Sequence, residues 1–350
     1  MNNELTQTWR DRFGWNILWL SILLLSLVLV NLFTGSVKIP LREASDILFF
    51  NGDEHVIWKN ILLKSRMPQT FTALIAGAAL AVSGLQMQTL FRNPLAGPSV
   101  LGISSGASLG VALVVLLFKG LSGYSLSDTG IFGNIGIAAA AFGGAMGVLS
   151  IIMLASRMVT SNTVLLIIGI MMGYAGSSLV GILKFYSDQA DLKSYVIWGL
   201  GSFSNVTSSE IPYLMLVMGV IIFISLFFTK QMNLYLLGES YAQNLGVNIK
   251  GIRFVLILLS GLLVAITTAY TGPIAFLGLA VPHIGRNLFL TSDHRKLLPY
   301  NIFLGAIIAL LCNMAASLPG FEGAIPINTI TSIIGAPIVI WVIIKQRSSL

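Results

Sequence analysis

The stretch RNPLAGPSVLGISSGASLG, residues 92–110, decides between a soluble nucleotide-binding fold and a membrane fold. A phosphate-binding glycine loop needs a lysine that reaches the phosphates, but no lysine lies between Lys64 and Lys119. Small residues four apart share one helix face and let membrane helices approach closely. The glycines of this stretch have that spacing: Gly102, Gly106 and Gly110. We therefore expect an inner turn that leads into a closely packed membrane helix.

The composition of the whole chain is typical of a membrane protein. Of its 350 residues, 55% are hydrophobic and 9% are charged, and the mean hydropathy is +0.87. A soluble domain carries about 25% charged residues, so this chain has too few charges to cover a surface in water. The net charge of +7 is spread along the sequence, which argues against nucleic acid as a partner. The single cysteine, Cys312, excludes an internal disulfide and a cysteine-rich metal site.

The expected fold class is an all-α polytopic membrane protein with ten transmembrane helices. Apolar runs of about 20 residues can cross a bilayer, and such runs lie at 15–33, 69–91, 98–118, 131–155, 163–183, 211–229, 252–270, 273–290, 300–318 and 327–344. No change of composition marks a second domain, so residues 1–350 are expected to form one transmembrane domain. With the N-terminus in the cytoplasm, most of the 20 Lys and Arg residues lie on the inner side. The expected topology is N-in and C-in.

Three connections between these spans are longer than simple turns. Residues 34–68 are expected outside, and their LREASDILFF run predicts a short amphipathic helix on the outer surface. Residues 184–210 are also expected outside. Residues 231–250 are expected in the cytoplasm, where Gly238 precedes a short helical pattern and Gly246 fits the position just after its end.

The sequence lacks the common signatures of enzymes. It contains no G-x-x-x-x-G-K-[ST], H-E-x-x-H or G-x-S-x-G motif, so no catalytic residue, metal ligand or bound cofactor is expected. Polar residues inside spans usually face the interior of the helix bundle, and Gln86, Gln88 and Asn313 lie in such positions. No charge lies clearly at the middle of a span, which argues against a carrier driven by protons or sodium. We expect the energy source to lie on another polypeptide.

Five motifs occur in order along nearly the whole chain. The first runs from Ser83-Gly84 through Gln88 to Arg92-Asn93-Pro94-Leu95-Ala96, followed by Pro98, Gly102 and Gly106-Ala107. The others are WGLGS at 198–202, LGESYAQNLGV at 237–247, GPIAFLGLAVPHIGR at 272–286 and IPINTITSIIGAP at 325–337. Together these motifs resemble the FecCD-type permease family, the membrane subunits of ABC importers for iron–siderophore complexes, haem and vitamin B12.

The resemblance implies a type II ABC importer permease fold in a bacterial inner membrane. It also implies partners: a second permease subunit that completes one central pathway, two cytoplasmic ATPase subunits that hold ATP and Mg, and a periplasmic or lipoprotein substrate-binding protein. A homodimer is the default, although some relatives pair two different chains. The motifs are shared by permeases of all these cargoes, so they leave the metal chelate open.

The LGESYAQNLG segment resembles the cytoplasmic coupling helix of this family. The resemblance assigns coupling to the ATPase to five positions: Gly238, Glu239, Ala242, Leu245 and Gly246. Because Ala242 and Leu245 are three residues apart, we expect them to share one helix face. The alternative is a surface helix without a partner.

Family members often carry an R-x-P-R pattern before the second span, whose arginines can meet glutamates of the binding protein. This chain reads Arg66-Met67-Pro68-Gln69, and Asn313 occupies another position where some relatives have arginine. Docking is therefore expected to depend on Arg66 with Lys59 or Lys64, or on a different pattern. Glu322 lies in the outer loop that follows Asn313. Anchoring to a lipid headgroup is the alternative for Arg66.

The function expected from these patterns is ATP-driven import of a bulky metal chelate by alternating access. Residues assigned to the pathway or to helix packing are Gln88, Gly102, Ser105, Gly106 and Gly110. The main alternative is a self-contained secondary transporter, which would work with an ion gradient alone. A membrane-embedded enzyme would need a convergent polar site, and a passive channel would not need the coupling segment.

Overall fold

The computed structural model describes residues 2–35, 37, 39–49, 56–122, 131–159, 161–317 and 325–347. The regular structure of these residues is helical. Its helices are α1 (Asn2–Phe33), α2 (Leu41–Phe49), α3 (Val56–Ile61), α4 (Met67–Phe91), α5 (Ile103–Ser122), α6 (Ile131–Met158), α7 (Asn162–Phe185), α8 (Gln189–Gly199), α9 (Ile211–Leu226), α10 (Thr229–Leu236), α11 (Glu239–Asn244), α12 (Ile249–Thr271), α13 (Leu277–Phe289), α14 (His294–Ala316) and α15 (Ile327–Arg347).

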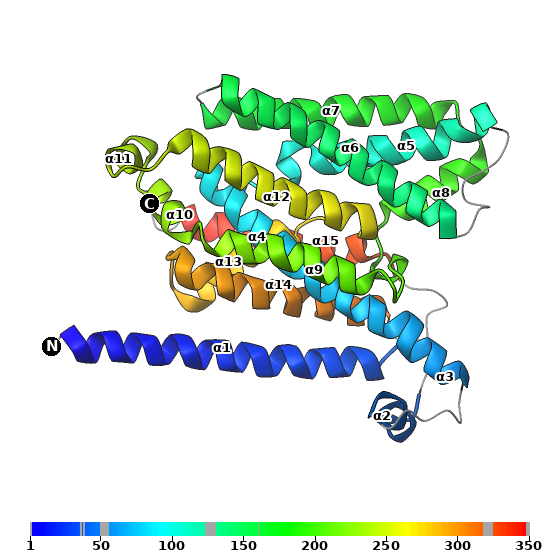
Figure 1. Ribbon diagram of the computed structural model, residues 1–350, viewed down its shortest axis with the longest axis horizontal. Coiled ribbons are helices and arrows are strands. Elements are labelled where there is room, and N and C mark those ends of the chain that lie inside the picture. The colour runs from blue at the N-terminus through cyan, green and yellow to red at the C-terminus, as the bar shows by residue number, and fades with distance from the viewer. Residues whose placement is uncertain are drawn as a thin grey trace.

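Helix α4 is the central helix of the bundle. It contacts α9, α12, α13 and α14, and the most apolar part of the span that contains it is 89% buried, against 22% for α1 and for α7. Figure 1 shows α1 along one edge of the molecule and α5, α6 and α7 grouped on the opposite side. The bundle therefore has a buried centre and two peripheral sides.

Glycines allow α4 to touch its neighbours through the backbone. A Cβ atom added to Gly77 would lie 2.2 Å from the carbonyl oxygen of Gly305 on α14, and one added to Gly305 would lie 2.3 Å from that of Gly77. At the crossing with α13, a Cβ on Gly84 would lie 1.6 Å from the carbonyl oxygen of Gly278. Real Cβ atoms do not approach so closely, so both crossings require glycine.

The glycine row of residues 92–110 is divided between two neighbouring helices. Gly102 has a left-handed φ of 73° and precedes α5. The expectation that it shares one helix face with Gly106 and Gly110 is therefore wrong. A Cβ added to Gly102 would lie 2.8 Å from the carbonyl oxygen of Gly169 on α7. Gly106 and Gly110 lie inside α5 and contact α6, where a Cβ on Gly110 would come within 2.1 Å of the carbonyl oxygen of Ala140.

The described helices include six that are long and apolar enough to cross a membrane, so the chain is a multi-pass membrane protein. Helices α9 and α10 form a bent pair at 52°, which makes a seventh span if they are counted together. The predicted span 273–290 is shorter than expected, because α13 has only 13 residues, or about 20 Å. The segment before it is not helical and includes Phe276 with a φ of 65°. The expected spans at 98–118 and 327–344 contain shorter apolar helices, Ile103–Leu116 and Ile327–Ile340.

The predicted connection 34–68 contains more helix than expected. Helix α2 lies where the LREASDILFF run predicts a helix. In addition, α3 continues through a π-helical turn at Leu62–Arg66 directly into α4. The predicted connection 184–210 contains α8.

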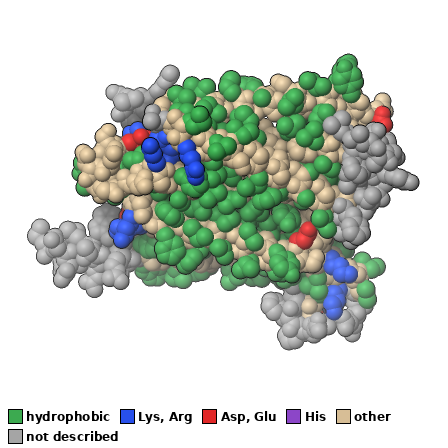
Figure 2. All heavy atoms as spheres, turned by 45° about the horizontal axis from the view of Figure 1, so that its top comes forward, with side chains coloured by type: hydrophobic (Ala, Val, Ile, Leu, Met, Phe, Trp, Pro, Cys, Tyr) green, Lys and Arg blue, Asp and Glu red, His purple; other side chains and the backbone are tan. Residues whose placement is uncertain are grey.

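The two ends of the molecule differ in the segments that they carry. Both chain ends lie at the same end as α11, and α2, α3 and α8 lie at the other (Figure 1). We call these the α11 end and the α2 end. Hydrophobic side chains cover the middle of the face seen in Figure 2, and the charged side chains visible there lie toward the ends. This distribution is that of a protein with an apolar belt.

Candidate functional site

Helix α11, which follows α10, is a short exposed helix with a defined beginning and end. Gly238 has a φ of 113° and separates α10 from α11. At the other end, the Val247 N–H donates to the carbonyl of Ala242 at 3.0 Å and the Gly246 N–H to that of Gln243 at 2.9 Å. This pair of bonds is a Schellman motif, and Gly246 supplies its left-handed residue with a φ of 85°. The short helix predicted between Gly238 and Gly246 is confirmed.

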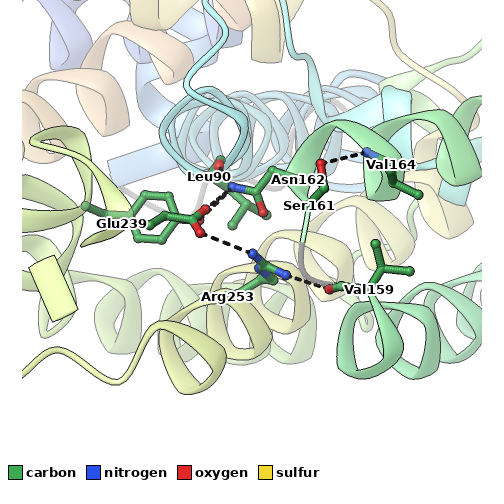
Figure 3. Close-up of polar contacts among 8 residues, drawn as sticks. Leu90, Val159, Ser161, Asn162, Val164, Glu239 and Arg253 are labelled. Carbon is green, nitrogen blue, oxygen red and sulfur yellow. Dashed lines mark hydrogen bonds and ion pairs between the residues drawn. The ribbon is translucent and has the colours of Figure 1, made fainter. Parts of the chain in front are cut away.

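The carboxylate of Glu239, the first residue of α11, points back into the protein (Figure 3). Its Oε1 accepts a hydrogen bond from the hydroxyl of Tyr235 at 2.6 Å and one from Nδ2 of Asn162 at 2.6 Å. Its Oε2 lies 3.6 Å from Nη2 of Arg253, in a pair whose side chains are 29% and 5% exposed. Glu239 therefore joins α10, α7 and α12.

Asn162 extends this cluster to the central helix. Its Nδ2 also donates to the carbonyl of Leu90, near the end of α4, at 2.9 Å, and lies 2.7 Å from the hydroxyl oxygen of Tyr235. An amide nitrogen has two protons, so three acceptors share them. Arg253 adds a bond from Nη1 to the carbonyl of Val159, at the end of α6, at 2.8 Å. We call Tyr235, Glu239, Asn162 and Arg253 the Glu239 cluster.

The other predicted coupling residues are divided between the inner and outer faces of α11. Ala242 is fully buried and Leu245 is 53% exposed, so the expectation that they share one face is wrong. Sequence reasoning did not select Leu237 and Tyr241, which are 63% and 53% exposed. With Leu245 they are three exposed apolar side chains four residues apart in the sequence, although the non-helical Gly238 separates Leu237 from the other two. We call these three residues the exposed apolar stripe.

Gln88 connects α4 to α13. It is buried, its Nε2 donates to the carbonyl of Leu279 at 3.1 Å, and its Oε1 accepts from Nη1 of Arg286 at 2.5 Å. These contacts occupy both ends of its amide, so they support the packing role. The pathway role of Gln88 stays a prediction.

Ser105 lies in a groove between α5 and α7 with a volume of about 280 Å³. Gly102, Gly169 and Gly173 line the same groove, together with the exposed ring of Tyr174. Two of the glycines of residues 92–110, Gly106 and Gly110, lie on the α6 side of α5 instead. A role of Ser105 in a pathway stays a prediction.

Arg66 is buried at the α2 end. Its Nη1 donates to the carbonyls of Leu32 and Phe33, both at 3.0 Å, and its Nη2 donates to the carbonyl of Val37. These bonds place the cation on the last carbonyls of α1, where a positive charge is favourable. Lys64 is exposed nearby, so of the two predicted docking residues only Lys64 is presented on the surface. Glu322 lies outside the described residues.

Two positions at which the sequence departs from the family pattern are in contact. Nε2 of Gln69 donates to Oδ1 of Asn313 at 2.9 Å, and Nδ2 of Asn313 donates to Oδ1 of Asn31 at 2.9 Å. The three amides connect α4, α14 and α1. They line a small cavity of about 70 Å³ together with Arg66.

Comparisons with known proteins place this architecture among transport permeases. The sequence model of the FecCD transport family matches residues 22–345. The vitamin B12 import system permease protein BtuC of Salmonella arizonae is 36% identical, and the alignment covers 99% of each chain. The hemin transport system permease protein HmuU of Yersinia pestis is 34% identical over 94% of this chain and 96% of that relative. A solved structure described as an inward-facing metal-chelate type ABC transporter is 30% identical, with a TM-score of 0.81 over 95% of this chain and 99% of that one.

Proposed function

This chain belongs to the FecCD transport family, and from that premise we propose that it is the membrane-spanning permease subunit of an ATP-driven importer of a bulky metal chelate. The support is the full-length similarity to permeases named for vitamin B12 and hemin, and to a metal-chelate type ABC transporter. The chain itself carries no ATPase motif. ATP and Mg would be bound by separate ATPase subunits, and this chain would bind no cofactor.

We propose that the chain lies in the inner membrane of a bacterium. It would cross this membrane ten times, with both termini in the cytoplasm. The spans beyond the six long helices would be the bent pair α9–α10, the shorter apolar helices of α5 and α15, and the 13-residue α13. The excess of Lys and Arg on the inner side supports the orientation. The position of both chain ends at the α11 end agrees with it (Figure 1).

The observation that carries the coupling proposal is the Glu239 cluster. The exposed apolar stripe Leu237–Tyr241–Leu245 would bind the ATPase subunit from the cytoplasm. Since the carboxylate of Glu239 is bonded to α7, α10 and α12, a displacement of α11 would be passed to these helices. Closure of the ATPase pair would thus change the tilt of the permease helices and drive alternating access.

A second copy of the chain would complete the pathway on the exposed side of α7. Ile167, Met171 and Tyr174 of this helix are each at least half exposed, and membrane helices with exposed small and apolar faces associate by close packing. The groove beside Ser105 opens on this side. A binding protein would dock at the α2 end and deliver the cargo to this groove.

The experiment is reconstitution into liposomes of this chain together with the ATPase subunits that copurify with it. Cyanocobalamin, haemin and a ferric hydroxamate siderophore are offered with the cognate binding protein. We expect ATP-dependent uptake of one of the three, and no ATP hydrolysis by the isolated chain. Hydrolysis by the isolated chain would overturn the proposal. Uptake by the chain alone under an ion gradient would favour the secondary transporter instead.

A further inference from the structure

Helix α10 is held by a second set of polar contacts, separate from the Glu239 cluster. Asn233 accepts a hydrogen bond at Oδ1 from the backbone N–H of His294 at 2.8 Å, and its Nδ2 donates to Oδ1 of Asp293 at 2.6 Å. Asp293 is the N-cap of α14, since its Oδ1 also accepts from the N–H of Arg295 at 3.0 Å. Asn233 therefore binds the beginning of α14 through both ends of its amide.

Charge and hydrogen-bond roles fix the orientation of this amide. Burial acts to raise the pKa of Asp293, but the bonds from Arg295 and Asn233 lower it overall, so the side chain is a carboxylate that only accepts. The N–H of His294 only donates. Nδ2 of Asn233 must face the carboxylate, and Oδ1 must face His294.

The same reasoning fixes the tautomer of His294. Its Nδ1 lies 2.7 Å from Oδ1 of Asn233, which is an acceptor, so Nδ1 carries the proton. In the neutral ring Nε2 is then an acceptor, and it lies 2.7 Å from Oγ1 of Thr89 on α4. The single hydroxyl proton of Thr89 has a second acceptor in reach, the carbonyl of Leu85 at 2.8 Å, so the bond to His294 forms when this proton faces Nε2. His294 is fully buried. A continuous polar chain thus runs from Asn233 through His294 to Thr89.

The two sets of contacts meet at neighbouring residues of α4. The Asn233 chain ends on Thr89, and the Glu239 cluster ends on the carbonyl of Leu90 through Asn162. On α10 the two sets start from Asn233 and Tyr235, two residues apart. Helix α10 is therefore fixed at two points to the same end of the buried central helix, just after the 52° bend that separates it from α9.

We propose that Asn233 is a positioning residue, which sets the angle at which α10 carries α11 by binding the N-terminus of α14 and, through His294, Thr89 of α4. The inference rests on the proposed function, because its effect is read in coupled transport. A displacement of α11 reaches α4 by two polar routes, and loss of the Asn233 route leaves α10 free to tilt without moving α14.

An exchange of the two side chains tests this proposal. Asn233→Asp places a second carboxylate beside Asp293, and two carboxylates at that distance repel each other. The double variant Asn233→Asp/Asp293→Asn removes this repulsion and restores a donor and an acceptor between the two side chains. Since Oδ1 of Asp293 accepts from both Asn233 and Arg295, the amide introduced at position 293 must rotate so that its nitrogen donates to the new carboxylate while its oxygen caps α14. Asp293→Asn alone keeps an acceptor at the cap and serves as the matched control.

The measurement is cargo uptake per ATP hydrolysed by the complex in liposomes. We expect this ratio to fall about tenfold in Asn233→Asp, as for a lost charge-assisted bond, and to return to within about twofold of the unsubstituted protein in the double variant. A wild-type ratio in Asn233→Asp, or no recovery in an assembled double variant, overturns the proposal. Absence of ATP-dependent uptake by the unsubstituted complex would instead refute the proposed function.

A second variant covers the case in which Asn233→Asp does not assemble. Thr89→Val keeps the shape of the side chain and removes the hydroxyl at the far end of the route, together with its contact to the carbonyl of Leu85 within α4. We expect a reduced ratio, by about threefold, with an unchanged yield of complex. An unchanged ratio in Thr89→Val would show that the route through His294 carries no coupling.

A spectroscopic readout is independent of the cargo. Spin labels are placed on the exposed residues Gln243 of α11 and Met158 of α6, in a chain whose Cys312 is replaced by serine. Asn233→Asp is expected to broaden the distance distribution between the labels, and the double variant to narrow it again. Equal widths in all variants would contradict a positioning role.

Discussion

Gln69 and Asn313 are hydrogen bonded across the interface of α4 and α14, with 2.9 Å between Nε2 of Gln69 and Oδ1 of Asn313. Asn313 passes the bond on to Asn31 of α1. Arginines at positions 69 and 313 would place two like charges side by side. The neutral amides instead hydrogen bond with one another and so connect α1, α4 and α14 at the α2 end of the molecule.

Gln69→Ala is expected to lower the free energy of unfolding by about 1–3 kcal/mol, because it leaves a buried amide oxygen without its donor. In a double-mutant cycle with Asn313→Ala, we expect a coupling energy of about 0.6 kcal/mol, the average for such bonds in membranes. Reversible unfolding in mixed micelles measures both. Ser26→Ala, at an exposed position on α1, is the control, and additive single variants would show that the bond contributes nothing.

Gly84→Ala is expected to prevent assembly of the bundle. The added Cβ would lie 1.6 Å from a backbone carbonyl oxygen, which cannot move away as a flexible side chain can. The loss of folding free energy should therefore exceed that of ordinary overpacking, which is about 1–3 kcal/mol. Gly147→Ala is the matched control, because no atom lies within 4 Å of its added Cβ. Yield of monodisperse protein and the unfolding midpoint distinguish the two, and a well-folded Gly84→Ala would refute the crossing.

Substitutions of Glu239 should uncouple transport from ATP hydrolysis in a graded way. Glu239→Gln keeps an oxygen for Tyr235 and Asn162 but loses the charge beside Arg253, whereas Glu239→Ala loses both. We expect uptake per ATP to fall by a few-fold in the first variant and by about tenfold or more in the second. Ser240→Ala, exposed on the same helix, should behave as the unsubstituted protein. Equal coupling in all three would remove the carboxylate from the mechanism.

Leu245→Asp and Ala242→Leu should have different defects: the first should weaken binding of the ATPase subunits, and the second should lower the stability of the chain. Leu245 is exposed, so an aspartate there should weaken retention of the ATPase subunits by about tenfold or more, as for loss of a hot-spot residue, without changing the unfolding midpoint. Ala242 is fully buried, so extra methylenes should lower the unfolding midpoint through overpacking. Copurification and thermal unfolding give the two readouts. Full ATPase retention by Leu245→Asp would exclude the exposed stripe as the binding surface.

Substitutions of Arg66 and Lys64 should affect different measurements, the first the unfolding midpoint and the second the capture of the binding protein. Arg66→Ala removes the bonds to the last carbonyls of α1 and should lower the unfolding midpoint whether or not a binding protein is present. Lys64→Glu changes an exposed charge and should leave the midpoint unchanged while it weakens capture of an acidic binding-protein surface. Reduced capture by Arg66→Ala with an unchanged midpoint would restore Arg66 to the docking surface.

The sequence predicts the membrane class, the family and the short helix after Gly238, because these depend on local patterns. Apolar runs report spans directly, and Gly238 and Gly246 mark backbone conformations that only a few residues adopt readily. The helix at 41–49 follows from its own amphipathic pattern in the same way.

The contacts between helices could not be predicted in this way. Nothing in the spacing of Asn162, Glu239 and Arg253 indicates that they meet, since they come from segments far apart in the chain. The end of a short helix is equally hidden: the spacing of Ala242 and Leu245 predicts one shared face, but α11 ends at Asn244 and Leu245 lies beyond its last helical residue. The interruption of a hydrophobic run by non-helical backbone, as before α13, is hidden in the same way.

The reciprocal contact of Gly77 and Gly305 has a consequence for the evolution of this chain. In most packed interfaces, a larger residue on one side can be rescued by a smaller one on the other. Here neither partner can become smaller, so no second mutation on the facing helix can compensate for the first. Amino-acid replacements should therefore accumulate on the exposed side of α1, whereas this crossing should remain unchanged as the lineage diverges.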